Sequence, residues 1–209
     1  DKIKNGAENI FGDDLFEVSN YLSGHIWDSI ARVIVSARKV MDYVKDIADI
    51  YADSGQHMEW VTPTGWIVLQ QYNETEQKRI KTHINGDVVS LSFPREKEAV
   101  NRHRTGLGAS PNFIHSLDAA AMTKTINHAS AYMRDFAMVH DSYGTHSAHM
   151  PLMSSILREE FVKMYEQNNV LTQLREHATI TLGTQDIPEP PEQGNLDLRS
   201  VLKSQYFFA

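Results

Sequence analysis

The sequence contains no cysteine, which excludes disulfide bonds and thiolate metal sites. It also contains no apolar run near the roughly 18 residues that a membrane span requires, so we expect no membrane partner. No signal-peptide pattern appears at its beginning. These absences lead us to expect an intracellular protein.

Basic residues are fewer than acidic ones: 20 Lys and Arg against 27 Asp and Glu give a formal net charge of -7. Because phosphate binding usually leaves a basic footprint, this average argues mildly against a nucleic-acid partner. The charge is unevenly distributed, however, and residues 78–104 (KRIKTHINGDVVSLSFPREKEAVNRHR) are locally basic. A partner could dock on that segment.

The first half of the sequence predicts a helix and two hairpins. Apolar residues recur at helical spacing from 18 to 52, which predicts one long helix that could bend near Ser23 and Gly24. Residues 57–72 alternate around Thr62-Pro63-Thr64-Gly65 and indicate a hairpin. A second hairpin is predicted with strands at 78–84 and 87–93, because Asn85-Gly86 suits the positive backbone angles of a type I′ turn.

The second half predicts further helices around one short hairpin. RHRTGLGAS (102–110) has two glycines and indicates a loop, followed by a helix that is capped by Ser110, begins at Pro111 and ends near Met133. Residues 136–147 indicate strand, tight turn and strand, and 150–178 are helical again. The proline-rich 187–194 cannot continue a helix, and a short helix is expected from Asn195. The whole predicts an α+β fold that is mostly helical.

One carboxylate stands out in the predicted short hairpin. The apolar strand ends in His140-Asp141-Ser142, so Asp141 lies in a tight turn where its oxygens can face a cleft. Mg²⁺, a hard cation, prefers such a ligand. The tripeptide alone is weak support, since an aspartate often only initiates a turn through its own backbone hydrogen bonds.

The order of the surrounding motifs carries a family resemblance. SPNFIHSLD (110–118) on a predicted helix, followed by FAMVHDSYG (136–144), resembles the last two motifs of the single-subunit RNA polymerases of bacteriophages and mitochondria. Upstream, WVTPTG (60–65) with Gln71-Tyr72 is similar to a hairpin of that family. Downstream, GNLDL (194–198) and the terminal Phe208-Ala209 resemble its C-terminal foot, whose aromatic residues we expect to be buried in the assembled enzyme. The likeness covers nearly the whole chain in the family's order.

The resemblance implies the C-terminal part of a right-hand polymerase fold, with palm and fingers elements and inserted β-hairpins. Residues 1–72 would form a long helix and a hairpin of the fingers and palm region. Residues 73–104 would form the promoter-specificity hairpin. Residues 105–209 would form the palm core, with the His-Asp-Ser hairpin and the C-terminal foot.

The resemblance also implies nucleotidyl transfer by two Mg²⁺ ions. Asp141 would be one of the two aspartates that hold the ions, and His140 would belong to the same active centre. His115 would lie near the 3′ end of the nascent RNA or the minor groove of the hybrid, although a histidine satisfied by helix packing remains the alternative. The implied partners are double-stranded promoter DNA, template DNA, nascent RNA and nucleoside triphosphates.

The second hairpin could read the promoter. A two-residue turn places Arg79, Lys81, His83, Ser90 and Ser92 on one face, opposite a mainly apolar face. A two-stranded ribbon fits the major groove, where Arg and Lys can donate to guanine and Ser can bond to several bases. The alternative is an ordinary solvated face, and the resemblance favours promoter contacts by Arg79, Lys81, Ser90 and Ser92.

Some parts of the family's active site lie upstream of the matching motifs, namely the second aspartate and a helix with a lysine and a tyrosine. We therefore expect a fragment that is inactive alone and has the missing upstream part of the polymerase as a partner. The alternatives are a non-catalytic DNA-binding remnant, a repair-type DNA polymerase fragment, which would have His-Asp-Glu where this chain has Ser142, and a zinc site at His140, His146 and His149. We expect a phage-encoded protein in the cytoplasm of an infected bacterium, in preference to an organelle matrix.

Overall fold

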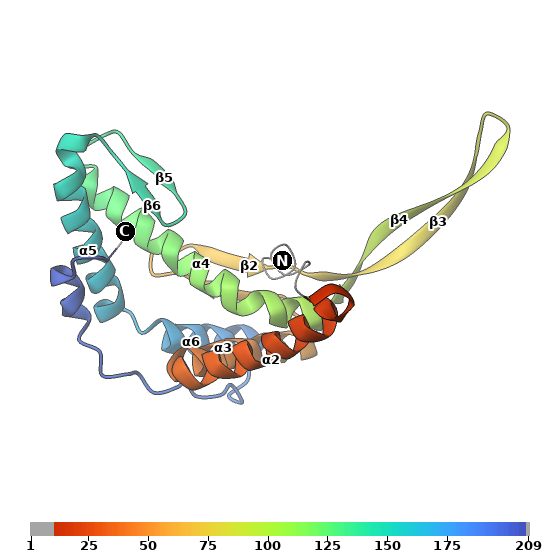
Figure 1. Ribbon diagram of the computed structural model, residues 1–209, viewed down its shortest axis with the longest axis horizontal. Helices are drawn as coiled ribbons and strands as arrows, with labels where there is room; N and C mark the ends of the chain where they lie inside the picture. The colour runs from red at the N-terminus through yellow and green to blue at the C-terminus, as the bar shows by residue number, and fades with distance from the viewer. Residues whose placement is uncertain (1–10, 208–209) are drawn as a thin grey trace. The chain divides into compact units, whose positions relative to one another are not determined.

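The computed structural model describes residues 11–207 and combines helices with three two-stranded antiparallel sheets (Figure 1). The predicted α+β class is confirmed. Contacts group the chain into two units, 1–42 and 43–209. Within residues 11–207, no helix combines enough length with enough apolar character to cross a membrane.

The predicted long helix is two helices. After the 3₁₀ turn η1 (Gly12–Asp14), α2 (Leu15–Val33) ends at Ile34, and α3 (Val35–Asp53) begins directly after it. The expected bend near Ser23 and Gly24 was wrong. Ile34 leaves helical geometry at φ -109° and ψ 58°. Three consecutive β-branched residues, Val33 to Val35, lose side-chain freedom in a helix, which makes this the weak point.

The first predicted hairpin is confirmed as β1 (Met58–Val61) paired with β2 (Ile67–Gln70). Its main anchor is Trp60, whose ring is 1% exposed. The Trp60 indole N–H donates to the Ser116 hydroxyl at 2.9 Å, and the ring meets the edge of Phe113 at a centroid distance of 5.9 Å. The hairpin is thereby fixed on the long helix α4 (Arg102–Ala129).

Helix α4 begins earlier than predicted. The expected loop at 102–110 is helical, because Asn101 caps the helix by accepting a hydrogen bond from the Arg104 amide at 2.9 Å. Pro111 lies inside the helix, which ends at Ala129, not near Met133. The glycines serve close packing, not a loop: a Cβ on Gly108 would lie only 2.9 Å from Tyr72 Cε2.

The second hairpin is confirmed and is longer than predicted. It consists of β3 (Asn73–Ile84) and β4 (Asp87–Val100), which extend as a two-stranded ribbon (Figure 1). Asn85 and Gly86 both have positive φ, 54° and 91°, as a type I′ turn requires. At the other end, the Asn101 amide donates to the Tyr72 carbonyl at 2.8 Å and closes the base of the ribbon.

The short hairpin is also confirmed, as β5 (Ala137–Val139) and β6 (Ser142–Gly144). It is followed by η2 (Ser147–His149), α5 (Met150–Gln167) and α6 (Val170–Leu182). Asn169 caps α6 and interrupts the predicted continuous helix at 150–178. The hairpin packs through Phe136, Met138 and Tyr143 on a buried cluster from α4, the segment after it, and α5: Ala129, Met133, Met153 and Ile156.

The proline-rich segment is non-helical, as predicted, and the last helix is the 3₁₀ element η3 (Leu198–Lys203), which begins later than expected. Arg158 of α5 holds η3 and the residue after it: its guanidinium donates to the carbonyls of Val201, at 3.0 Å, and Ser204. It also lies 5.7 Å from the ring of Phe207, which packs against Phe161. The predicted terminal Phe208 and Ala209 lie outside the described residues.

Two fully buried threonines of α4 give a matched stability test. The Thr105 hydroxyl has no hydrogen-bond partner among the described residues, whereas the Thr125 hydroxyl donates to the Ala121 carbonyl at 2.8 Å. Replacing a buried unpaired hydroxyl by a methyl group is neutral or stabilising, whereas losing an existing hydrogen bond lowers the free energy of unfolding by about 1 kcal/mol. We predict that Thr125→Val lowers the free energy of unfolding in urea and that Thr105→Val does not. Equal losses from both changes would contradict this assignment.

Candidate functional site

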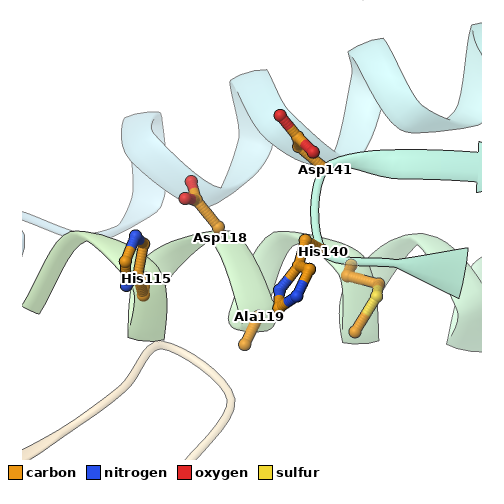
Figure 2. Close-up of a pocket in the computed structure, with 6 residues that line it drawn as sticks. His115, Asp118, Ala119, His140 and Asp141 are labelled. Carbon is orange, nitrogen blue, oxygen red and sulfur yellow. The ribbon is translucent and has the colours of Figure 1, made fainter. Parts of the chain in front are cut away.

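A cavity of about 630 Å³ brings the predicted catalytic residues together (Figure 2). Helix α4 contributes His115, Asp118, Ala119 and Met122, and the β5–β6 turn contributes His140 and Asp141. The four α4 residues follow the spacing i, i+3, i+4 and i+7, which places them on one face of the helix. The structure thus places His115, His140 and Asp141 at one cavity, while the roles expected for them stay predictions.

The β5–β6 turn is tight because Val139 pairs directly with Ser142, which leaves only His140 and Asp141 between the strands. His140 adopts a positive φ of 53°, a conformation that costs a non-glycine residue on the order of 1 kcal/mol. Figure 2 shows the Asp141 and Asp118 carboxylates pointing to the same side, whereas the His140 ring points to the other. The turn therefore presents two different side chains in two directions.

Negative charge accumulates at this cavity. Burial raises the pKa of Asp118, and the Asp141 carboxylate raises it further against the opposing effect of His115. Burial also raises the pKa of the Tyr143 hydroxyl, with contributions from both aspartates. The carboxylates are thus close enough to repel one another, and a cation between them would relieve the repulsion.

Asp118 is a residue that the sequence reasoning missed, although it stands in the quoted motif. The available signal was its spacing of three from His115, which puts both on one helix face. Carboxylate oxygens suit Mg²⁺. Within residues 11–207, however, no group of three or more His, Asp or Glu side chains is placed to hold a metal ion. The donor type therefore fits magnesium, while the number of donors is too small to enclose it.

The lack of such a metal-binding group among residues 11–207 also concerns the zinc site considered at His140, His146 and His149. Instead of converging with His140 and His149 on a metal position, His146 faces Asp135 at 3.3 Å on the surface. No metal-binding cluster forms from these histidines in the described part of the chain. The structure gives the zinc alternative no support.

Asp141 also borders a second cavity, of about 320 Å³, on the α5 side of the turn. Its wall includes Ser154 and Leu157 of α5. The Ser154 hydroxyl accepts a long hydrogen bond, 3.5 Å, from Arg158, the residue that holds η3. Helix α5 thus contacts both the β5–β6 turn, across this cavity, and the C-terminal segment.

The predicted promoter-contacting residues lie on the β3–β4 ribbon and do not line either cavity at Asp141. The register pairs Arg79 with Ser92 and Lys81 with Ser90, so the four side chains share one face, as predicted. Lys78 pairs with Phe93 and belongs to the opposite face. The Ser92 hydroxyl donates its hydrogen to the Gln77 side-chain oxygen at 2.9 Å, so this hydrogen is already engaged.

Comparison with known proteins gives one matching family model, described as DNA-dependent RNA polymerase, over residues 1–187. The chain is 36% identical over 195 residues to DNA-directed RNA polymerase 2B, chloroplastic/mitochondrial, of Nicotiana tabacum, covering 93% of this chain and 19% of the relative. It is 35% identical to DNA-directed RNA polymerase 2A of the same plant, covering 93% of this chain and 57% of the relative.

A similar match in Arabidopsis thaliana is DNA-directed RNA polymerase 2, chloroplastic/mitochondrial, 36% identical over 200 residues, with 95% of this chain and 19% of the relative covered. The chain therefore spans about a fifth of the length of two of these relatives and just over half of the third. Several relatives are named for plant organelles, which contradicts the expected location in an infected bacterium. That prediction was wrong, because the quoted motifs occur in both groups of polymerase.

The raised pKa of Asp118 predicts a pH-dependent stability difference. The pKa of Asp118 is higher in the folded than in the unfolded state. As pH rises from the unfolded pKa through the folded pKa, such a carboxyl increasingly destabilises the fold. In metal-free buffer, Asp118→Asn should therefore be more stable than the parent at pH 7. The gain should shrink towards zero below the unfolded pKa of about 3.9. Urea unfolding at both pH values measures it.

The control is Asp135→Asn, because Asp135 is exposed and lies outside the cavity. It should give no comparable gain at pH 7. An Asp118→Asn variant that is less stable than the parent at pH 7 would contradict a raised pKa of Asp118 in the folded state.

Proposed function

The chain belongs to the family of DNA-dependent RNA polymerases, and we propose that it supplies such an enzyme with a catalytic carboxylate and a promoter-binding hairpin. The observation that carries the proposal is the cavity that Asp141, at a strained two-residue turn, lines together with His115 and Asp118 of α4. The organellar names of several relatives support a plastid or mitochondrial site of action.

Asp141 is the ligand for Mg²⁺ in this proposal. A bound ion would polarise the attacking 3′ hydroxyl and offset the charge that develops on the departing pyrophosphate. The chain's own contribution is to hold the Asp141 carboxylate at the mouth of the cavity, with Asp118 adding negative charge beside it. His115, on the same wall, can donate a hydrogen bond to the RNA end or to the minor-groove edge of the hybrid.

Further ligands must come from another part of the polymerase. Residues 11–207 provide no complete metal-binding group, and the chain corresponds to about a fifth of two of the relatives' length. The second metal-binding aspartate and the residues that handle the incoming nucleotide would belong to that remainder. We therefore propose that residues 1–209 are inactive alone and become active when they are joined or complemented by it.

The family assignment suggests places for the segments in a right-hand polymerase. The α4–α5 region with the β5–β6 turn would form the palm core, and the β3–β4 ribbon would be an insertion at its edge. The alternative of a non-catalytic DNA-binding remnant would keep the ribbon without the chemistry. The strain at His140 favours the catalytic proposal, because strained backbone persists where the surrounding structure enforces it, often at functional sites.

Substitution of Asp141 separates these two functions. In the complete polymerase, Asp141→Asn keeps the shape of the turn and removes the anionic ligand. We predict a loss of nucleotide addition on a primed template of about 10²-fold or more in Mg²⁺. Binding to promoter DNA should change little, because the ribbon does not line the cavity.

The matched control is Asp135→Asn, which removes an exposed carboxylate just before β5. It should extend RNA at the parental rate. Near-parental extension by Asp141→Asn would remove the catalytic assignment and favour the DNA-binding remnant.

The β3–β4 ribbon is the proposed promoter reader. Its Arg79, Lys81, Ser90 and Ser92 share one face, and the ribbon width suits the major groove. Arg and Lys can donate to guanine N7 and O6 there, and the Ser90 hydroxyl can bond to several bases. The opposite face carries apolar side chains such as Ile80 and Leu91.

The two faces provide their own control. We predict that Lys81→Ala costs about 1 to 3 kcal/mol in binding to the cognate promoter and relaxes preference at one or two base pairs. Transcription from a promoter-independent template should be unchanged. Lys78→Ala removes the same charge from the opposite face and should leave base preference intact. A uniform loss on all templates would show that Lys81 contacts only phosphate.

A further inference from the structure

We propose that Tyr72 and Arg104 form a phosphate-binding site at the base of the β3–β4 ribbon. The site is a shallow cavity of about 280 Å³ lined by Tyr72, Arg104, Leu107 and Gly108. Its ligand is a backbone phosphate of the duplex DNA that the ribbon holds, so the inference rests on the proposed function.

The Tyr72 ring is held in place by a chain of hydrogen bonds. Its hydroxyl accepts from the Asn112 amide at 3.3 Å, and the same nitrogen donates to Gln70 at 3.1 Å. Gln70 is 4% exposed and donates to the Thr105 carbonyl at 2.7 Å. Because the Tyr72 oxygen accepts in this network, its own hydrogen remains available to a phosphate oxygen.

The guanidinium of Arg104 is oriented by the same ring. Its central carbon lies 4.9 Å from the ring centroid of Tyr72, which fixes the plane of the group and leaves its N–H edges open. Gly108 keeps the cavity open, since a Cβ there would lie 2.9 Å from Tyr72 Cε2 and 3.2 Å from its hydroxyl. The donors are therefore placed before any ligand arrives, which lowers the entropy cost of binding.

The charge of Arg104 is uncompensated, unlike that of its neighbour Arg102. Arg102 lies 2.6 Å from Asp53 and 3.5 Å from Asp49, and Lys45 lies 3.0 Å from Asp49. Two cations thus face two carboxylates and cancel. Among residues 11–207, Arg104 contacts no carboxylate. A planar guanidinium with free N–H edges matches the geometry of a phosphate.

The position along the ribbon fits a single duplex. Tyr72 directly precedes β3, and Arg79 lies seven residues further along the strand. At about 3.3 Å per residue this is about 23 Å, the length of about seven base pairs. A duplex read by Arg79 and Lys81 can therefore place a backbone phosphate at Arg104.

The test measures DNA binding by the complete polymerase, with fluorescent promoter and unrelated duplexes over a range of salt concentrations. Arg104→Ala should weaken binding to both duplexes equally, by about threefold to tenfold, and should lower the slope of log affinity against log salt by about one. Arg104→Lys keeps the charge but lacks the planar guanidinium, so its affinity for DNA should lie between those of Arg104→Ala and the parent. Melting temperatures of all variants check folding.

The control is Arg102→Ala. It removes an equal charge, two residues before Arg104, from a side chain that is already paired with Asp53. This substitution should reduce the affinity for DNA less than Arg104→Ala does, because in this proposal the Arg102 side chain contacts no phosphate. Equal effects of the two changes on affinity, or an unchanged salt slope for Arg104→Ala, would overturn the inference. A parental polymerase that does not extend RNA would instead refute the proposed function, since the binding measurement needs no catalysis.

Discussion

The packing of Trp60 against α4 is the contact on which both functional surfaces depend. The indole bonds to Ser116 and its ring meets Phe113, so the β1–β2 hairpin is fixed at the middle of the helix. Removing a buried tryptophan typically costs about 3 to 5 kcal/mol. From this anchor, one direction along α4 leads to the base of the ribbon at Tyr72. On the helix itself, His115 and Asp118 lie one and two residues from Ser116 and line the cavity that they share with the β5–β6 turn.

In the proposed function, helix α4 acts as a rigid spacer between the promoter-binding ribbon and the Asp141 cavity. Arg104 and Asp118 are separated by fourteen residues, which is about 21 Å of helix at 1.5 Å per residue. Glycine at 106 and 108 lets α3 and Tyr72 approach the helix backbone, as the distances to Asp49 and Tyr72 show. The same glycines would weaken an isolated helix, so tertiary packing must sustain it.

The charges of the second unit follow a division of roles. Several of its surface cations are paired with carboxylates, as in Arg199 with Glu166 and Arg175 with Glu189. At the Asp141 cavity the two carboxylates repel, and at the ribbon base Arg104 is left without a carboxylate among residues 11–207. In our two proposals, this uncompensated charge prepares each place for an opposite charge, a cation at the cavity and a phosphate at the ribbon base.

The sequence predicted local features well and tertiary ones poorly. The hairpins at Asn85-Gly86 and His140-Asp141 were predictable because their turns follow from the residues themselves. The start of α4 was not, because two glycines suggest a loop and Pro111 suggests the first turn of a helix. Only the Asn101 cap and the packing of Tyr72 override these signals. The break at Ile34 was missed because apolar spacing continues through it.

The motif order indicated Asp141, His140 and His115 as candidate site residues, but it did not indicate Asp118. Its carboxylate matters only because the β5–β6 turn packs beside α4, a contact between residues far apart in sequence. Localisation failed for a different reason. The motifs describe the chemistry that phage and organelle enzymes share, so they contain no information about the compartment.

The central claim, that the Asp141 turn holds a catalytic divalent ion, is tested most directly by metal-dependent cleavage. In the complete polymerase, Fe²⁺ in place of Mg²⁺ generates hydroxyl radicals that cut the backbone near the ion, and mass spectrometry locates the cuts. The account predicts cuts at residues 139–142 and near Asp118 that excess Mg²⁺ suppresses and that Asp141→Asn abolishes. Mg²⁺-sensitive cuts confined to other segments, with none at this turn, would contradict it.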